Sequence, residues 1–151
     1  MTRVEKNAEA EFFAAVDAAS QEAVWAAIAT VDGNVPRVRM VHPTWEGPVL
    51  WFATSADSPK AQQLRANPAI DIQYQVSSPT FVHILVHGRC EFPEDDATRQ
   101  HVWNHMDYDL ADFWPGGVTD PGFMPVKVVP SRVELSEMFG MQNKRVWYSD
   151  T

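Results

Sequence analysis

Cysteine is nearly absent from this sequence, and so are long apolar runs. Cys90 is the single cysteine in 151 residues, so no disulfide can form within the chain and a reducing compartment is expected. No run approaches the roughly 20 apolar residues that a transmembrane helix needs. The charged N-terminal residues also differ from a secretory signal peptide. We therefore expect a soluble cytoplasmic protein with no membrane partner.

Positive charge is also scarce. The chain carries 12 Lys and Arg against 20 Asp and Glu, which gives a net charge of −8 at pH 7 with histidine neutral. Such a surplus of negative charge repels phosphate polymers and anionic lipid surfaces. Nucleic acid is therefore not expected as a partner, and any anion site must be a local cluster of basic residues.

Several catalytic motifs are missing as well. The sequence contains no Gly-x-Ser-x-Gly, no Gly-x-Gly-x-x-Gly and no Walker sequence. The nucleophile elbow of hydrolases, the Rossmann fingerprint and the phosphate-binding P-loop are therefore not indicated. Cys90 falls on the apolar face of its predicted strand, which disfavours thiol chemistry.

What is present suits one globular domain over residues 1–151, with a hydrophobic content of 45%. Apolar residues at three- and four-residue steps predict a helix over 2–20. Thr2 and Glu5 have the spacing of a capping box, which would begin that helix.

From about residue 23 the apolar pattern changes to short runs separated by turn residues, which is typical of β-strands. The first connections are too short for a helical crossover, so antiparallel neighbours are expected. In a later strand, alternation places Ile70, Ile72, Tyr74 and Val76 on one face. The predicted strands are 23–31, 36–45, 49–54, 70–76 and 81–92.

Two further helices are predicted. Ser58 and Pro59 suit the cap and first turn of a short helix, which Asn67 and Pro68 would end. The acidic residues after Pro93 favour the positive end of another helix, which would run to about Met106 and lead into a loop over 107–122.

The last part of the chain reads as a closing hairpin over 123–138, with strands 123–129 and 131–138, followed by a tail over 139–151. Mostly contiguous strands with two or three helices indicate an α+β protein. We expect a closed or nearly closed β-barrel of about six antiparallel strands, flanked by those helices.

The most informative polar cluster is basic. Arg37 and Arg39 lie on one face of a predicted strand, and Ser58 and Lys60 lie at the start of the short helix. Backbone N–H groups at a helix start, a lysine charge and a hydroxyl suit a phosphate group. The same residues also suit a solvated strand and a well-capped helix, and composition does not choose between these interpretations.

Histidines offer a second candidate site. His101 and His105 are one helical turn apart, with Asp107 and Asp109 beyond, which is a spacing that could hold zinc. No glutamate follows the first histidine, so the metalloprotease motif is absent. We interpret these side chains as a solvated helix face and expect no metal.

Two other features have ordinary structural interpretations. His83 and His87 share one strand face without a nearby carboxylate or cysteine on that face, so we expect a buried or interfacial pair. Tryptophans are most often core residues, but Trp114 stands in a Pro/Gly loop and is predicted to be displayed on the surface.

Three segments in order carry a resemblance to a known family. They are Arg39-Met40-Val41, then Leu50-Trp51-Phe52-Ala53-Thr54, then Ser58-Pro59-Lys60-x-x-x-Leu64-x-x-Asn67-Pro68. In this order and spacing the chain resembles the pyridoxamine 5′-phosphate oxidase-like split-barrel flavoproteins, and within them the general stress protein type. The resemblance runs from about residue 10 to residue 136.

The resemblance implies a homodimer that binds two FMN molecules in clefts between the subunits. It implies that Arg39 and Lys60 pair with the FMN phosphate, that Ser58 caps it, and that Arg37 adds a compensating charge. It also places His83 where the oxidases direct a glutamine at the flavin. The remaining residues expected to line the flavin are Met40, Val41, His42, Phe52, Ala53, Thr54 and Trp114.

Departures from the family pattern narrow the expected activity. Pro59 replaces a second basic residue, Thr44 replaces a substrate-binding lysine, and residues 138–151 lack the C-terminal oxidase motif. We therefore expect an FMN oxidoreductase that passes electrons from a reduced nicotinamide to a small acceptor, and not a pyridoxine phosphate oxidase. The alternatives are a flavin-binding stress module without turnover, or a split barrel that binds the deazaflavin F420 or haem.

Overall fold

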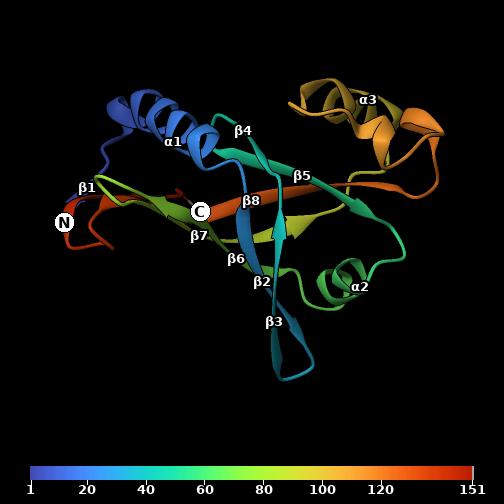
Figure 1. Ribbon diagram of the computed structural model, residues 1–151, viewed down its shortest axis with the longest axis horizontal. Coiled ribbons are helices and arrows are strands. Elements are labelled where there is room, and N and C mark those ends of the chain that lie inside the picture. Colours follow the sequence, from blue (N-terminus) through green and yellow to red (C-terminus); the bar gives the residue numbers. More distant parts are fainter. Residues whose placement is uncertain (151) are drawn as a thin grey trace.

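The computed structural model describes residues 1–150, except for the side chains of residues 75–77. The described chain forms an α+β structure in which one mixed sheet curls on itself (Figure 1). The strands are β1 (Thr2–Arg3), β2 (Ala26–Asp32), β3 (Val35–Val41), β4 (Thr44–Glu46), β5 (Val49–Ser55), β6 (Ala69–Ser77), β7 (Val82–Glu91), β8 (Phe123–Glu137) and β9 (Gln142–Tyr148). The α-helices are α1 (Glu9–Ala23), α2 (Pro59–Ala66) and α3 (Asp96–His105).

The expected barrel of about six strands is confirmed as the ring β2, β3/β4, β5, β8, β7 and β6. Each neighbouring pair in this ring is antiparallel. β3 and β4 are not paired with each other but follow one another along the chain, separated only by His42 and Pro43. Together they occupy one position in the ring. β3 therefore pairs with β2, whereas β4 pairs with β5.

The predicted hairpin over 123–138 is wrong, because β8 is a single strand of 15 residues. Pro130, which suggested a turn, lies opposite Gly88 at an irregularity in the pairing of β7 with β8. Proline has no N–H to give to a sheet, and such an irregularity is where a strand tolerates it. β8 pairs with β7 along one edge, and with β5 and then β9 along the other.

Both chain ends also differ from the prediction. Residues 139–151 are more than a tail, because β9 pairs with β8 and, in parallel, with β1. The start of the predicted helix 2–20 is wrong, and Thr2 forms no capping box. The N–H of Val4 instead donates to the Val146 carbonyl at 2.8 Å. A 3-10 turn over Lys6–Ala8 then leads into α1.

The predicted cap of α2 is confirmed, and α3 begins among the acidic residues as expected. Ser58 caps α2 by accepting a hydrogen bond from the Ala61 N–H, and Asn67 ends the helix. Asp95 caps α3 by accepting one from the Thr98 N–H. The predicted loop over 107–122 contains two 3-10 turns, Leu110–Asp112 and Gly117–Thr119.

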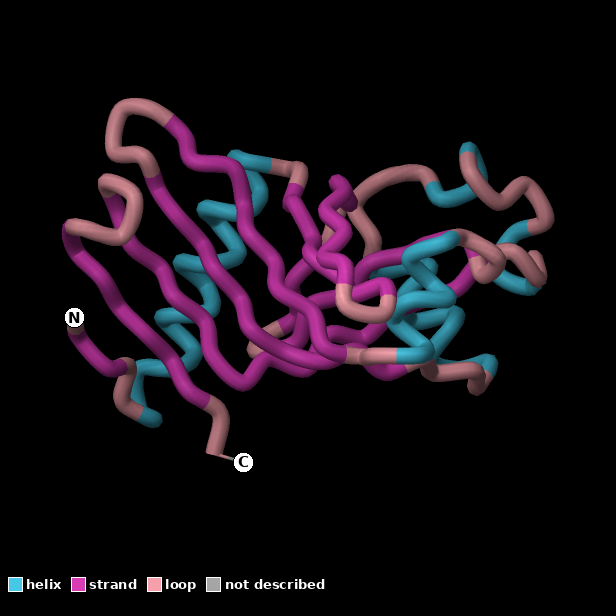
Figure 2. Tube along the Cα trace, turned by 90° about the horizontal axis from the view of Figure 1, so that it is seen from below, coloured by secondary structure: helices cyan, strands magenta, loops and turns pink. Residues whose placement is uncertain are grey.

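Two apolar clusters hold these elements together. The larger one fills the barrel and includes Phe12 and Val16 of α1, which lies across one face of the sheet (Figure 2). The smaller one packs α3 and the following loop against β5 and β8 through Trp51, Val102 and Leu110. No helix in the described chain is long and apolar enough to cross a membrane.

The predicted faces of β6 and β7 are largely confirmed. Ile70, Ile72 and Tyr74 are buried, whereas the side chain of Val76 lies outside the described residues. Cys90 is buried in the barrel cluster, and burial raises the pKa of its thiol to about 12. That pKa keeps the thiol protonated near neutral pH, as expected for a structural cysteine.

Candidate functional site

A cavity of about 430 Å³ opens where β3 ends, beside β5, the start of α2 and the loop after α3. This volume is ordinary for a small-molecule site. Seven of the twelve residues predicted to bind a cofactor line it: Met40, Val41, His42, Ala53, Thr54, Lys60 and Trp114.

The two cations predicted to bind a phosphate, Arg39 and Lys60, lie near each other at the edge of this cavity. Arg39 donates to Thr30 Oγ1 and to Gln63 Oε1 of α2, both at 3.0 Å. These partners are neutral, and no ion pair of Arg39 or Lys60 is found among the described residues. The pair of cations therefore lacks an anion.

The pKa of Lys60 is affected by this lack of a negative partner. Burial lowers it below the usual value for lysine, and the nearby charge of Arg39 lowers it further. Two like charges held together without a counterion repel each other, so binding an anion between them would be favourable. A phosphate group has the charge and the acceptor oxygens for this position.

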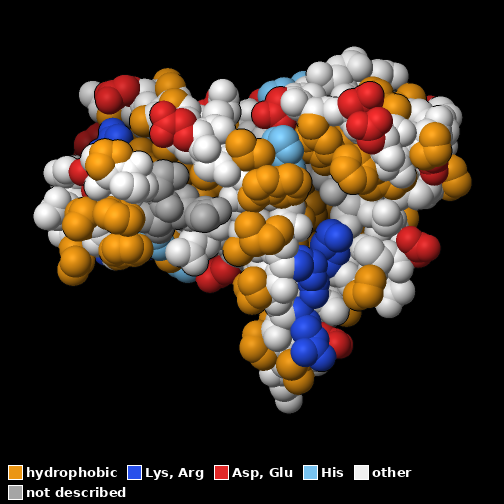
Figure 3. Space-filling view, in the orientation of Figure 1, with side chains coloured by type: hydrophobic (Ala, Val, Ile, Leu, Met, Phe, Trp, Pro, Cys, Tyr) orange, Lys and Arg blue, Asp and Glu red, His pale blue; other side chains and the backbone are white. Residues whose placement is uncertain are grey.

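Two other predicted phosphate contacts lie differently. Ser58 is occupied within the fold, because its hydroxyl caps α2 and lies 3.2 Å from Thr54 Oγ1. Arg37 does not line the cavity and lies 3.8 Å from Asp32 on the β2–β3 hairpin. Basic side chains form a stripe along this projecting hairpin, beside exposed hydrophobic ones (Figure 3).

Aromatic side chains form part of the cavity wall. The ring of His42 is stacked on Tyr108 at 4.5 Å and lies 5.5 Å from Trp25. His42 Nε2 is also 2.7 Å from Asp107 Oδ1. The loop after α3 therefore holds the His42 ring through both Tyr108 and Asp107. This wall offers flat apolar surfaces to a planar ligand.

Three predicted residues are placed differently from expectation. The side chain of Phe52 is fully buried in the barrel core, on the face of β5 opposite to that of Ala53, and it does not line the cavity. His83 is not a cavity residue and lies 4.0 Å from Glu134. Trp114 does line the cavity, but it is only 7% exposed, so its predicted surface display is wrong.

Several lining residues were missed by sequence reasoning. Phe113, and not its neighbour Trp114, is the displayed aromatic residue of the loop, with 63% of its surface exposed. The loop contains an unusual alternation of acidic and aromatic residues, which is the signal that could have pointed to it. The missed residues are Trp25, Ser55, Tyr108, Asp109, Asp112 and Phe113.

A larger cavity, of about 580 Å³, offers less for an anion. Its lining includes two arginines, Arg65 and Arg99. The Arg65 guanidinium donates to the Ala56 carbonyl, and that of Arg99 donates to the carbonyls of Phe123 and Val118. Both cations thus hold loops in place, whereas Lys60 is left to meet a ligand.

The expectation that no carboxylate lies near the β7 histidines is wrong, because each of them has a carboxylate partner. His87 Nδ1 lies 2.9 Å from Asp71 Oδ1 of β6. The other partner, Glu134, approaches His83 from β8. Neighbouring strands supply both carboxylates, so spacing within one strand could not predict them.

A family model described as Pyridoxamine 5′-phosphate oxidase like matches residues 28–144. Among curated proteins, no sequence matches this chain.

Solved structures share the fold. One is a protein from Clostridium acetobutylicum related to general stress protein 26 of B. subtilis, with a TM-score of 0.73, 16% identity, and 97% of this chain and 98% of that chain covered. General Stress Protein 26 from Bacillus anthracis gives a TM-score of 0.64 at 19% identity, over 80% and 92% of the two chains. A FAD-binding protein from Mesorhizobium loti gives a TM-score of 0.59 at 21% identity, with 72% of this chain and 82% of that chain covered.

Proposed function

The chain belongs to the pyridoxamine 5′-phosphate oxidase-like family, and we propose that it is a flavoprotein that binds FMN in the cavity between β3, β5 and α2. The observation that carries this proposal is the pairing of Lys60 with Arg39 in the absence of a described acidic partner. The FMN phosphate would supply the missing negative charge. The shared fold of a FAD-binding protein supports a flavin as the ligand.

The rest of the cavity suits the flavin ring. Trp25, Tyr108 and Trp114 offer apolar surfaces, and the short side chain of Ala53 leaves space on the β5 side. Backbone groups around Met40 and Val41 would orient the ring edge. When bound, FMN would supply the redox chemistry, and the protein would supply orientation and electrostatics.

We propose an oxidoreductase that takes electrons from a reduced nicotinamide and passes them to a small acceptor. Asp109 and Asp112 line the cavity, and Lys60 is the only lysine or arginine among the described side chains that line it. A phosphorylated substrate would therefore meet carboxylates with no second described cation to bind its phosphate. We expect no oxidation of pyridoxine 5′-phosphate.

Haem is less well supported than a flavin. His42 is the one histidine lining the cavity, and its Nε2 is already paired with Asp107. An axial ligand would have to break that pair. The deazaflavin F420 carries a phosphate too, so a direct comparison with FMN must separate these two ligands.

Binding tests this proposal most directly. Lys60→Ala and Arg39→Ala should each weaken FMN binding by roughly 10- to 100-fold, as expected for a charge-assisted phosphate contact. Riboflavin, which lacks the phosphate, should lose little affinity. Flavin fluorescence quenching measures both ligands, and F420 is titrated in parallel.

The matched control is Arg89→Ala, because Arg89 is an exposed cation paired with Glu91 outside the cavity. It should leave FMN affinity unchanged. Wild-type FMN affinity in both cavity variants would contradict the phosphate site. Tighter binding of F420 than of FMN would replace the proposed cofactor.

Turnover is tested separately by anaerobic mixing of the flavin-loaded protein with reduced nicotinamide. Bleaching of flavin absorbance faster than for free FMN is expected from an oxidoreductase. Bleaching at the free-FMN rate would support a flavin-binding module without turnover. Steady peroxide release with pyridoxine phosphate would show that the expected exclusion of that substrate is wrong.

A further inference from the structure

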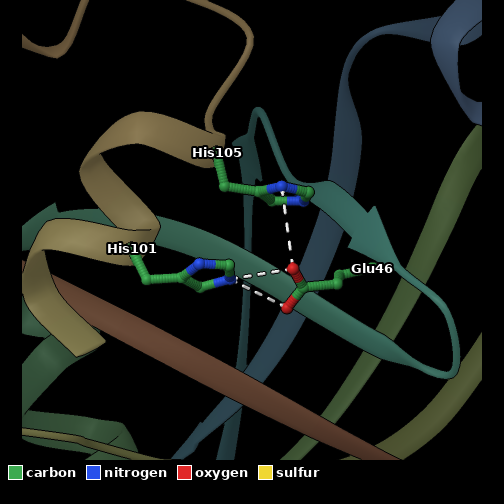
Figure 4. A group of neighbouring side chains, drawn as sticks. All are labelled: Glu46, His101 and His105. Atoms are coloured by element: carbon green, nitrogen blue, oxygen red, sulfur yellow. Dashed lines mark hydrogen bonds and ion pairs between the residues drawn. The ribbon is translucent and has the colours of Figure 1, made fainter. Parts of the chain in front are cut away.

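Three metal-ligating side chains meet outside the cavity. His101 and His105 lie one turn apart on α3, so both project from the same helix face. They face Glu46 of β4, as Figure 4 shows. His101 Nε2 is 2.8 Å from Glu46 Oε2, and His105 Nδ1 is 3.9 Å from the same oxygen.

His105 is oriented as a metal-binding histidine is. Its Nε2 lies 3.0 Å from the Trp45 carbonyl oxygen, which can only accept, so this nitrogen carries the proton. In the neutral ring, the lone pair is then on Nδ1, the atom directed at Glu46. Ligating histidines in proteins commonly donate their second ring N–H to a carbonyl or a carboxylate in this way.

Glu46 is likewise held in position. The Trp51 indole N–H donates to its Oε1 at 3.1 Å. Burial alone would raise the pKa of Glu46, but the hydrogen bonds from His101 and Trp51 favour the ionised carboxylate and the net shift is downward. The net pKa lies below its usual range, so the group is a carboxylate at neutral pH.

The spacing is compatible with one metal ion. One ligand atom from each of the three side chains lies within 4.8 Å of the others. A tetrahedral zinc site with bonds of about 2.0–2.2 Å needs ligand atoms roughly 3.3 Å apart. The ligand atoms that are farther apart than this would have to approach one another. The half-exposed side chain of His101 is free to make that movement.

We propose that Glu46, His101 and His105 form a binding site for zinc or a similar divalent transition metal. Two imidazoles and one carboxylate suit such ions, and water would complete the coordination. Asp107 and Asp109, the partners suggested by the sequence, are used elsewhere, since Asp107 pairs with His42 and Asp109 caps a 3-10 turn.

The metal would clamp the last turn of α3 to β4. No other group of three such ligands comes as close in the described part of the chain. The proposed site lies outside the flavin cavity, and it does not depend on the proposed flavin function.

The test is Zn²⁺ titration by calorimetry of the tag-free protein as purified, after treatment with a chelator. One Zn²⁺ should bind per chain, and Co²⁺ should give the visible absorption of a low-coordinate site. His101→Asn, His105→Asn and Glu46→Gln should each weaken binding at least on the order of 100-fold. Loss of merely an outer hydrogen-bond partner already costs about 10- to 100-fold.

The matched control is His87→Asn, because His87 also pairs with a carboxylate but belongs to no group of three such ligands in the described chain. It should bind Zn²⁺ like the wild type, and Zn²⁺ should raise the Tm of both proteins. Circular dichroism before titration confirms that each variant is folded. Absence of wild-type binding at about 100 μM Zn²⁺, or equal binding by the three site variants, would overturn the proposal.

Discussion

Glu134 is a buried charge surrounded by partners. It is 4% exposed, and it accepts hydrogen bonds from Arg132 at 3.0 Å and Ser136 at 3.1 Å. Burial would raise its pKa, but these bonds and the charges of Lys144 and Arg132 outweigh burial and lower the pKa below its usual range. Folding therefore favours the ionised carboxylate.

We expect Glu134→Gln to lower the free energy of unfolding at pH 7 by about 1–3 kcal/mol, since it removes charged hydrogen bonds from a buried site. A carboxylate whose pKa is lowered by folding stabilises the protein at pH values above its unfolded-state pKa of about 4.3. This contribution is lost as the pH falls through the pKa of the folded state. The difference between variant and wild type should thus shrink below about pH 4. Urea unfolding at pH 7 and at pH 3.5 measures it.

Glu137→Gln is the control in the same strand. Glu137 accepts a hydrogen bond from Asn143 at an exposed position, so its removal should cost little at either pH. An equal deficit of Glu134→Gln at both pH values would show that the lost stability comes from packing and not from charge.

Site residues could be predicted where the signal lies within a few positions of the sequence. Ser58 and Lys60 were found because a helix start requires such residues within a few positions. Glu46 was not connected to His101, because the two are 55 positions apart and meet only through folding. The family resemblance implies that both Phe52 and Ala53 contact the flavin, although strand alternation directs their side chains to opposite sides of β5.

At the scale of elements, the contact between β7 and β8 depends on Gly88. A Cβ at this position would lie 2.7 Å from the Val129 carbonyl oxygen and 3.1 Å from the Pro130 Cα. Both atoms belong to the backbone, so neither can move aside cheaply. We expect Gly88→Ala to lower the free energy of unfolding by about 1–3 kcal/mol, the usual cost of overpacking.

Gly33→Asn is the control for this substitution. Gly33 has φ +61° at the β2–β3 turn, and nothing lies within 4 Å of a Cβ there. Asparagine tolerates such a conformation, so chemical denaturation should show only a small loss. A stable Gly88→Ala variant would mean that β8 shifts away from β7 at Pro130.

Most elements could be predicted because their signals are local. Caps and alternation defined α2, α3 and the strands from β2 to β7. Pro130 predicts a false turn, since the sequence does not show that β8 accommodates it at an irregularity in its pairing with β7. The first residues gave a false helix because β9, at the far end of the chain, supplies their hydrogen-bond partners.

At the scale of the whole molecule, exposed hydrophobic side chains surround the cavity and the β2–β3 hairpin. Val38 is 70% exposed, Met40 53% and Trp25 51%. Contiguous apolar surface of this kind marks interaction sites. A second copy of the chain would cover it and close the cavity, as the resemblance to dimeric flavoproteins implies.

We therefore expect a homodimer in sedimentation, and we expect Val38→Glu to shift it toward the monomer. The same variant should weaken FMN binding, because the uncovered cavity loses part of its wall. Met141→Glu, at an exposed position between β8 and β9 that does not line the cavity, serves as the comparison. A monomeric wild-type protein that still binds FMN tightly would contradict this assembly.

The single long β8 also sets the order in which the molecule can be completed during synthesis. Its partners β5 and β7 are made first, and each keeps an unpaired edge until residues 123–137 leave the ribosome. Unpaired edges of this kind favour aggregation. The nascent chain therefore carries an open sheet until β8 has emerged and closes the ring between β5 and β7.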